Sequence, residues 1–577
     1  LLMLGANPYE SNGSLCTAPD FPGRLENIRD RGGKVIVVDP RRTKTAAHAD
    51  RWIPIRPGTD AAFLLALAHV LFAEGLVDPG PVGNLLEGVD RIRELVAPFS
   101  PEAVTLFTGV APETTRQVAR DLAAAPTAAV YGRIGTHTVS FGTLASWAVD
   151  LLNALTGNLD RAGGAMFPYA AHLSPRRKAK AFRTGRWHSR VRGLGEVMGE
   201  LPVATLADEI ATPGEGQVRL LITVAGNPVL TTPDAGRLDA ALETLEFMVS
   251  VDPYLNETSR RADVVLPPPS ALERSHYDLA FTGLSVRDFA DYSPAVFEGT
   301  GPSEFEILAR LTAIALGMGA AADPDQLAGA SLLAAVQEAV STPDSIVAGR
   351  DPAEIMSMLG ERPWPERFLD LMLRLGHRGD GFGARPGGLT LAVLEAHPHG
   401  VDFGPLAPRL EQILSTESGM VDLTPAAIVA DLPRLISELE RAPSGQELVL
   451  IGRRQLRSAN SWAHNVEVLM KGKERCTLQI HPGDASRIGL EDGATASVAS
   501  ATGRVELPVE VTADISQGVV SIPYGWGHDL DGARLTVAAL RPGVNTNLLS
   551  DAGAIDPLSG NAVLNGIPVT VTAGPTA

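Results

Sequence analysis

The first 165 residues alternate short apolar runs with longer stretches in which apolar residues recur at helical spacing. Apolar runs predict buried strands at residues 1–4, 35–38 and 127–131. Helical spacing predicts helices at residues 21–31, 61–74, 112–124 and 141–155. Because strands and helices that alternate along a chain usually build a parallel sheet covered by helices, this pattern predicts a doubly wound α/β fold.

The pattern changes twice further along the chain. Residues 321–445 are rich in helical spacing and are interrupted by joints of Gly and Pro. After residue 445, short β-branched runs alternate with turn signals at residues 448–451, 477–480, 494–498, 505–511 and 519–522. This pattern predicts an all-β barrel or sandwich of about 130 residues.

Comparison of the chain with itself shows two copies of one unit. Residues 1–8 and 220–228 are each an apolar strand that ends in a small-residue turn with Asn-Pro. A second strand then ends in Asp-Pro, and both copies fit the pattern D-P-x4-T-x3-A-D, which starts at Asp39 and at Asp252. We therefore expect three parts: an α/β unit at residues 1–165, a second α/β unit with a helix-rich extension at 166–445, and a β-barrel at 446–577.

The repeated unit has the chemistry of a nucleotide site. Its tight turn presents backbone N–H groups, and the helix that follows adds a dipole that favours phosphate. An acidic residue after the next strand can accept hydrogen bonds from ribose hydroxyls. Neither turn is G-x-G-x-x-G and no Walker loop is present, so a plain NAD or ATP site is not indicated. Two copies favour two related nucleotides or one ligand with two nucleotide arms; the alternative is a duplicated architecture without a ligand.

Length and composition exclude several classes of protein. The 577 residues exceed what one hydrophobic core can organise. A content of 45% hydrophobic and 20% charged residues excludes wholesale disorder, and a net charge of −18 argues against nucleic acid as a partner. Cys16 and Cys476 are the only cysteines, which excludes a disulfide scaffold and a self-contained four-cysteine metal site. No segment is long and apolar enough to span a membrane.

Several motifs resemble the molybdopterin oxidoreductase family, which includes dimethyl sulfoxide reductase, formate dehydrogenase and periplasmic nitrate reductase. They lie at residues 5–8, 39–43, 55–60, 155–158 with 163–164, 226–228, 262–267 with Glu273, 458–465, 480–493 and 556–560. The resemblance covers essentially the whole chain and is weakest between residues 316 and 445. It implies two related Rossmann-like units and a C-terminal barrel of the double-psi type.

The resemblance also implies a cofactor: one molybdenum or tungsten held by two molybdopterin guanine dinucleotides. One guanosine-phosphate arm is implied to contact Gly5, Asn7, Pro8, Asp39, Arg41, Thr43, Pro57, Gly58 and Asp60. The other is implied to contact Gly226, Asn227, Pro228, Asp252 and Asp263. The pterins are implied to lie near Ser458, Asn460, Trp462, His464, Asn465, Asn545 and Asn547. His464 is the candidate catalytic residue, with a structural hydrogen-bonding role as the alternative.

In this family the cysteine motif and the metal ligand lie upstream of the first Asn-Pro loop. The chain opens on a strand-like run without a starting Met, so we interpret it as a fragment that is inactive alone. We expect a 4Fe-4S cluster only in the missing segment, no metal ligand in these residues, and packing roles for Cys16 and Cys476.

The expected function is two-electron redox of a small substrate at the metal, of formate dehydrogenase or oxyanion reductase type, with the protein holding and tuning the cofactor. An electron-transfer partner subunit and a cytoplasmic location are expected. Two alternatives stay open: a non-catalytic relative, as in respiratory complex I, and a hydratase that uses the same cofactor without redox turnover.

Overall fold

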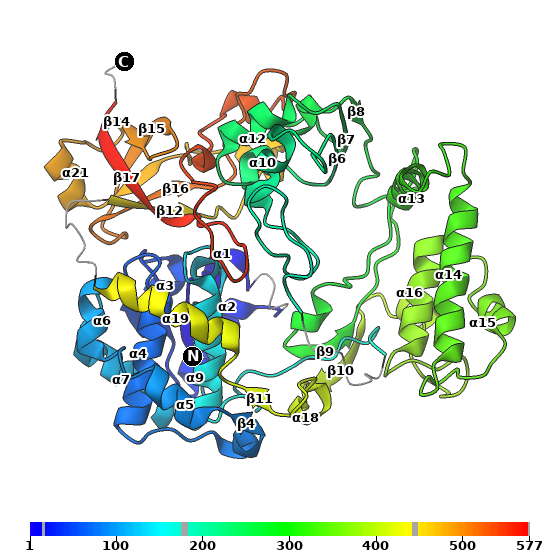
Figure 1. Ribbon diagram of the computed structural model, residues 1–577, viewed down its shortest axis with the longest axis horizontal. Coiled ribbons are helices and arrows are strands. Elements are labelled where there is room, and N and C mark those ends of the chain that lie inside the picture. The colour runs from blue at the N-terminus through cyan, green and yellow to red at the C-terminus, as the bar shows by residue number, and fades with distance from the viewer. Residues whose placement is uncertain (14–17, 175–182, 441–447, 575–577) are drawn as a thin grey trace.

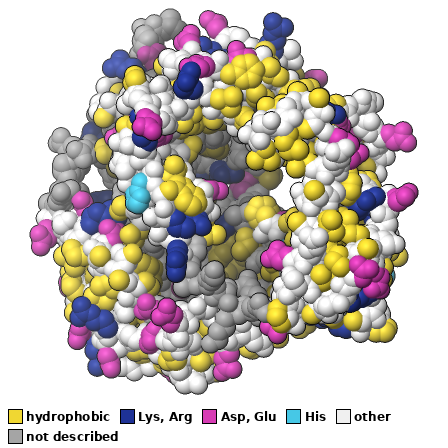
Figure 2. All heavy atoms as spheres, turned by 45° about the vertical axis from the view of Figure 1, so that its right-hand side comes forward, with side chains coloured by type: hydrophobic (Ala, Val, Ile, Leu, Met, Phe, Trp, Pro, Cys, Tyr) yellow, Lys and Arg dark blue, Asp and Glu magenta, His cyan; other side chains and the backbone are white. Residues whose placement is uncertain are grey.

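The computed structural model describes residues 1–13, 18–174, 183–440 and 448–574 (Figure 1). Two α/β units, a β-barrel and a helix-rich extension form separate bodies around a hollow, whose rim carries hydrophobic side chains (Figure 2). The predicted α/β fold class with a C-terminal barrel is confirmed. None of the described helices is long and apolar enough to cross a membrane.

The first unit contains a four-stranded parallel sheet in the order β3 (Arg51–Ile53), β2 (Ile36–Val38), β1 (Leu2–Leu4), β5 (Val130–Gly132). One face packs against α2 (Phe21–Asp30) and α3 (Lys44–His48). The other face packs against α4 (Asp60–Ala73), α7 (Pro112–Ala124) and α9 (Gly142–Leu155). Every residue of β1 and β2 is buried, as expected for a parallel sheet covered on both faces. The shorter helices of this unit are α1 (Pro8–Ser11), α5 (Val89–Leu95), α6 (Pro101–Thr108) and α8 (Ile134–His137).

The strand expected at residues 127–131 begins three residues later than the apolar run. The backbone N–H of Ala128 donates to the side chain of Asn158 at 2.8 Å, and that of Val130 to Asn153 at 2.9 Å. Side-chain oxygens therefore bind these two N–H groups, while Ala129 O accepts from the backbone N–H of Leu2 in β1 at 2.9 Å.

The second unit has a three-stranded parallel sheet in the order β6 (Leu220–Val224), β7 (Phe247–Val251), β8 (Val264–Val265). Helices α10 (Leu206–Ala211) and α12 (Ala235–Leu242) pack on one face, and α11 (Pro228–Thr231) follows the Asn-Pro turn.

The extension contains a short antiparallel pair, β9 (Arg287–Ala290) with β10 (Val401–Pro405). Its helices are α13 (Glu304–Ala315), α14 (Pro324–Ser341), α15 (Pro352–Met358), α16 (Trp364–Leu375) and α17 (Leu391–Glu395). The next helix, α18 (Leu410–Ile413), contributes Leu410 to the core of the first unit. The chain then returns to the first unit. There β11 (Val421–Asp422) pairs with β4 (Leu86–Glu87), and α19 (Ala426–Leu439) contributes Leu432 and Leu435 to the first core. The spatial unit built on residues 1–165 therefore also includes residues 410–439.

The C-terminal domain is a closed six-stranded barrel with a compact core. Its strands are β12 (Leu448–Arg453), β13 (Leu478–Ile480), β14 (Thr495–Ala499), β15 (Arg504–Val511), β16 (Val519–Pro523) and β17 (Asn565–Ala573), with α20 (Glu467–Met470) and α21 (Pro482–Ile488) between them. Strand β17 closes the barrel by pairing with both β12 and β14. The barrel packs against both α/β units (Figure 1).

Candidate functional site

The two Asn-Pro turns have the same internal hydrogen bonds. In the first, Thr45 Oγ1 donates to Asn7 Oδ1 at 2.8 Å. In the second, Thr258 Oγ1 donates to Asn227 Oδ1 at 2.7 Å. Each hydroxyl also accepts from the backbone N–H two residues after the asparagine, at 3.1 and 3.0 Å. The sequence repeat is therefore a structural repeat, and both asparagine side chains help to hold the turn.

The Asp-Pro motifs also match. Asp39 and Asp252 each accept a hydrogen bond at 2.8 Å from the backbone N–H two residues later. Burial raises the pKa of Asp39 to about 6 and also raises the pKa of Asp252. Both carboxyl groups lie at the carboxyl ends of their strands, the edge at which open α/β sheets bind ligands.

A second acidic side chain, Asp60, lies near Asp39 in the first unit. Asp60 is the first residue of α4 and is buried, after a Pro57-Gly58 turn in which Gly58 has a φ of +82°. Burial, with the negative charge of Asp39 adding to it, raises the pKa of Asp60 to about 7. Two acidic groups thus interact electrostatically beside the first turn.

Asp263 is not brought to this edge. Its carboxylate accepts from the backbone N–H of Met248, at the start of β7, at 2.8 Å. Asp50 makes the equivalent bond to Val35 at 2.8 Å in the first unit. The final aspartate of the repeated pattern therefore lies at the opposite end of the sheet from Asp252.

The glycines of the two turns differ. Gly5 has a φ of +59°, and a Cβ there would lie 2.7 Å from the Cα of Gly135. Its glycine is required by the close approach of these two backbones. In the second unit, Ala225 takes the positive φ, +53°, and Gly226 has no such requirement. Pro8 and Pro228 start α1 and α11, and Thr43 caps α3 by accepting from the backbone N–H of Ala46 at 3.1 Å.

The barrel docks onto the Asp-Pro loop of the first unit. Arg41 forms an isolated bridge with Ile515, and Ser516 donates to Pro40 O through its backbone N–H at 3.0 Å. Arg453, at the end of β12, is buried, and its guanidinium group donates to Ser521 O and Thr477 O. Burial and, after it, the charge of Arg41 together lower the pKa of Arg453 to about 9. The Nε atoms of both arginines are buried without a partner among the described residues.

Two asparagines that the resemblance implied to lie near the pterins hold the barrel to the second unit. Asn545 Nδ2 donates to Val229 O at 2.9 Å, and Asn547 Nδ2 donates to Leu230 O at 2.6 Å. Both asparagines are buried, so they fix the barrel against the helix that follows Asn227.

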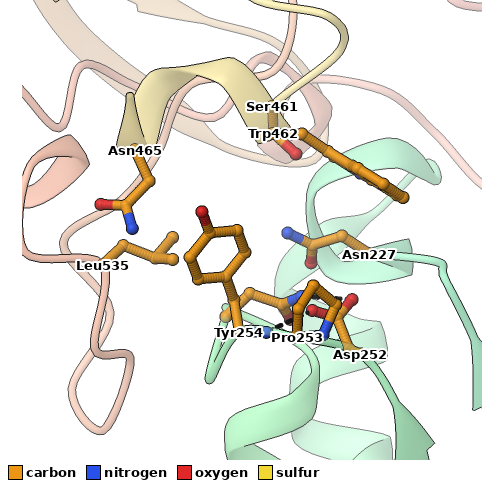
Figure 3. Close-up of a pocket in the computed structure, with 9 residues that line it drawn as sticks. Asn227, Asp252, Pro253, Tyr254, Ser461, Trp462, Asn465 and Leu535 are labelled. Atoms are coloured by element: carbon orange, nitrogen blue, oxygen red, sulfur yellow. Dashed lines mark hydrogen bonds between the residues drawn. The ribbon is translucent and has the colours of Figure 1, made fainter. Parts of the chain in front are cut away.

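A pocket lies between the second unit and the barrel (Figure 3). Asn227, Asp252 and Tyr254 line one side, and the turn that carries Ser461, Trp462 and Asn465 lines the other. The side chain of Tyr254 points toward that turn, and Trp462 is half exposed. Four of the predicted site residues, Asn227, Asp252, Trp462 and Asn465, therefore meet here.

His464 lies behind this pocket at the end of a buried series of hydrogen bonds. Asn227 Nδ2 donates to Glu257 Oε2 at 2.8 Å, Glu257 Oε1 lies 2.9 Å from His528 Nδ1, and His528 Nε2 lies 2.7 Å from His464 Nδ1. The His464 ring packs on Trp526, with ring centroids 4.0 Å apart. Burial and then the neighbouring His528 lower the pKa of His464 to about 3, so its ring is neutral near pH 7. Its Nε2 is buried and has no partner among the described residues.

The remaining predicted residues lie outside the pocket. Ser458 is buried and donates to Gln455 O at 2.8 Å, while Asn460 is exposed and accepts from Arg454 at 2.7 Å. Cys476 is buried, and burial raises the pKa of its thiol to about 11, as suits a packing thiol. Cys16 lies outside the described residues. In the part of the chain that is described, no three His, Cys, Asp or Glu side chains are grouped to hold a metal.

Sequence reasoning missed Glu257, His528, Ser461 and Arg453. Glu257 directly precedes the repeated Thr258, which was the one signal that could have found it. Its role depends on His528, which is far away in sequence and has no recognisable motif.

Comparison with known proteins agrees with this geometry. Residues 1–299 match the molybdopterin oxidoreductase family, and residues 448–568 match the molybdopterin dinucleotide binding domain. The chain is 28% identical to the F420-dependent formate dehydrogenase subunit alpha of Methanocaldococcus jannaschii over 315 residues, or 50% of this chain and 43% of that protein. It is 26% identical to the dimethyl sulfoxide/trimethylamine N-oxide reductase of Rhodobacter capsulatus over 566 residues, or 88% of this chain and 63% of that protein.

The chain thus spans less than half the length of the first of these relatives. Among solved structures, acetylene hydratase from Pelobacter acetylenicus has the same fold, with a TM-score of 0.71 at 20% identity. That match covers 99% of this chain and 77% of the hydratase. Because the first match covers more than half of the chain and the second covers the barrel, this protein belongs to the molybdopterin oxidoreductase family and has its dinucleotide-binding domain.

Proposed function

We propose that this chain holds one molybdenum or tungsten through two molybdopterin guanine dinucleotides and serves two-electron redox of a small substrate at the metal. The observation that carries the proposal is the duplicated turn. Two Asn-Pro loops with the same hydrogen bonds lie at the carboxyl ends of two parallel sheets, and one barrel packs against both. Two similar sites suit two similar nucleotide arms.

Unpaired buried atoms fit such a ligand. The Nε atoms of Arg41 and Arg453 suit an anionic phosphate, because both are buried without a partner among the described residues and the two guanidinium groups are close enough to interact. The free Nε2 of His464 suits one hydrogen bond to a pterin edge. Asp39, Asp60 and Asp252 suit hydrogen bonds from guanosine N–H and O–H groups.

When bound, the metal and its pterins supply the two-electron chemistry. The chain binds and orients this group, and the neutral His464 contributes hydrogen bonding without adding charge. Glu257 of the second unit bonds to His528 of the barrel, and His528 bonds to His464. These two contacts fix the orientation of the His464 ring. We place the 4Fe-4S cluster and the protein ligand to the metal outside residues 1–577, with an electron-transfer subunit as partner and a cytoplasmic setting.

The test is chemical analysis of the protein purified from its source without oxygen. We expect one molybdenum or tungsten and two guanosine monophosphates per protein. Asp39→Ala and Asp252→Ala should each lower nucleotide content at least about tenfold, since each removes a hydrogen-bond acceptor at the carboxyl edge of its sheet. Exposed Asp90→Ala, on α5, is the matched control and should retain full content. Protein without metal or nucleotide would refute the proposal, whereas a loaded protein that turns over without electron transfer would favour the hydratase alternative.

A further inference from the structure

A separate cavity of about 230 Å³ lies between the second unit and the barrel. Helices α11 and α12 form one wall, and barrel residues within 504–505, 527–530 and 543–548 contribute the other. No residue that lines the pocket of Figure 3 lines this cavity, and of the residues implied to hold the cofactor only Asn545 does. The side-chain amide of Asn545 is already bonded to Val229 O. The cavity is therefore distinct from the candidate cofactor site, and it lies at a domain interface, where ligand pockets are common.

Most of the cavity wall is apolar. Val229, Ala235 and Val505 line it and are themselves buried. The partly buried Leu530 and Leu548 also line it, and they pack against the cores of the second unit and of the barrel respectively. Such a wall favours a ligand whose apolar surface it removes from water. The cavity therefore suits a ligand with a compact apolar body.

Two charged side chains of opposite sign also line the cavity. Arg504 begins β15 and Asp529 follows β16, and both are accessible to solvent. No hydrogen bond or ion pair joins either side chain to another residue in the described part of the chain. A third charged group, Asp239, is already neutralised, because its carboxylate pairs with Arg260 at 2.5 Å and with Arg261 at 2.9 Å. The cavity thus presents one free positive and one free negative charge beside an apolar wall.

We propose that this cavity binds a small zwitterion with an apolar body, of the size of a branched-chain amino acid. Arg504 suits the carboxylate of such a ligand and Asp529 its ammonium group. A volume of about 230 Å³ is below the roughly 300 Å³ at which pockets for drug-sized ligands begin, so the ligand is small. Because the cavity joins two domains, a bound ligand also stabilises the docking of the barrel on the second unit. The inference does not depend on the proposed cofactor.

Isothermal titration calorimetry of the purified protein tests the ligand class, with L-leucine as the probe. We expect a dissociation constant of about 1 mM or lower. Isocaproate, which lacks the ammonium group, and isoamylamine, which lacks the carboxylate, should each bind at least about tenfold more weakly. No binding of L-leucine, or equal binding of either analogue, would overturn the proposal. The metal and guanosine content of the same preparations reports on the proposed function separately.

Substitutions test the location of the site. Arg504→Gln and Asp529→Asn each remove one charge from an exposed position and should weaken L-leucine binding at least about tenfold. The matched control is Glu506→Gln, because Glu506 is exposed on the same strand as Arg504 but does not line the cavity, and it should bind as the wild type does.

A third variant, Gly236→Leu, fills the cavity without changing its charge. Gly236 does not have a positive φ, and within 4 Å a Cβ there would meet only Leu548, at 3.7 Å, so a side chain fits without backbone strain. This variant should abolish L-leucine binding while the protein stays folded. Unchanged affinity in any of the three variants would place L-leucine elsewhere and overturn the proposal.

Discussion

The two α/β units share their loops but not their surroundings. Both hold an Asn-Pro turn with one threonine hydroxyl, and in both the next strand ends in an aspartate that accepts from the backbone N–H two residues later. In the first unit, β1 and β2 are buried on both faces, whereas in the second no described strand pairs with the outer edge of β6, and every second residue of β6 is exposed. The turn geometry therefore depends on a few local hydrogen bonds and not on complete burial of the sheet.

The residue before the repeated threonine differs as well. In the first unit it is Lys44, an exposed side chain that pairs with Glu10. In the second it is Glu257, a fully buried side chain bonded to Asn227 and to His528 of the barrel. The same position thus faces solvent in one copy and connects two domains in the other.

The largest expected difference is in hydrophobic burial. Leu4→Ala should lower the free energy of unfolding by about 2–5 kcal/mol, because a fully buried side chain leaves a cavity. The equivalent Val224→Ala should change it by less than about 0.5 kcal/mol in residues 1–577. Urea denaturation of both variants measures this difference, and comparable losses would mean that the second sheet is covered as well as the first.

The next difference separates Glu257 from Lys44. Glu257→Gln should cost about 1–3 kcal/mol at pH 7, since it weakens a buried hydrogen bond to His528, and Lys44→Gln less than about 0.5 kcal/mol. Burial alone would raise the pKa of Glu257, but hydrogen bonding and charge from His528 outweigh burial and hold this pKa below its ordinary value of 4.5. The wild-type advantage is therefore present above pH 4.5 and lost as the pH falls below it. A cost that does not vary with pH would show that the charge of Glu257 is unimportant.

Because the two Asn-Pro turns have the same hydrogen bonds, we expect equivalent substitutions in them to lower stability equally. Thr45→Val and Thr258→Val each remove the hydroxyl that bonds the asparagine and the turn backbone, and each should cost about 1–2 kcal/mol. Thermal unfolding of the two variants, with the exposed Thr300→Val as control, tests the equivalence. Costs that differ by more than about 1 kcal/mol would contradict it.

The smallest expected effect is a gain in stability on replacement of Asp39. Burial raises the pKa of Asp39 to about 6, so without ligand its native state binds a proton more tightly than the unfolded state. Stability from this group is therefore present below its ordinary value of 3.8 and lost as the pH rises through 6. Asp39→Asn should raise the stability of ligand-free protein by about 1 kcal/mol at pH 8 and leave it unchanged at pH 3.5. Asp252→Asn should act in the same direction, and a loss of stability at pH 8 in either would show that the charged carboxylate is favourable in the apo-protein.

Local patterns predicted the elements well, but not their partners. The helix expected at residues 112–124 is found at those residues, and five of the six barrel strands were located by their β-branched runs. Strand β17 was missed because its side chains alternate with Gly, Pro and Thr, which weakens the apolar signal. Contacts between distant segments, such as α19 on the first core, leave no local pattern.

The residues of the candidate site were likewise predicted where they follow a strand directly, and not where their role depends on a distant partner. The repeat located both turns and their aspartates because each follows directly from a strand. It could not distinguish Asp263, which holds the start of β7, from Asp252, because both are acidic residues of one motif. Likewise Asn545 and Asn547 have the chemistry of ligand contacts but donate to backbone carbonyls of the neighbouring unit.

The docking of one C-terminal barrel on both α/β units has a consequence for biosynthesis. Ribosomes complete both Asn-Pro turns well before residues 448–574, so the pocket walls that Ser461, Trp462 and Asn465 provide are synthesised after the walls that face them. A bulky ligand can therefore reach the nascent α/β units before the barrel closes over them. Asn545 and Asn547 then bond to the second unit, so the docking of the barrel completes the second wall of the pocket.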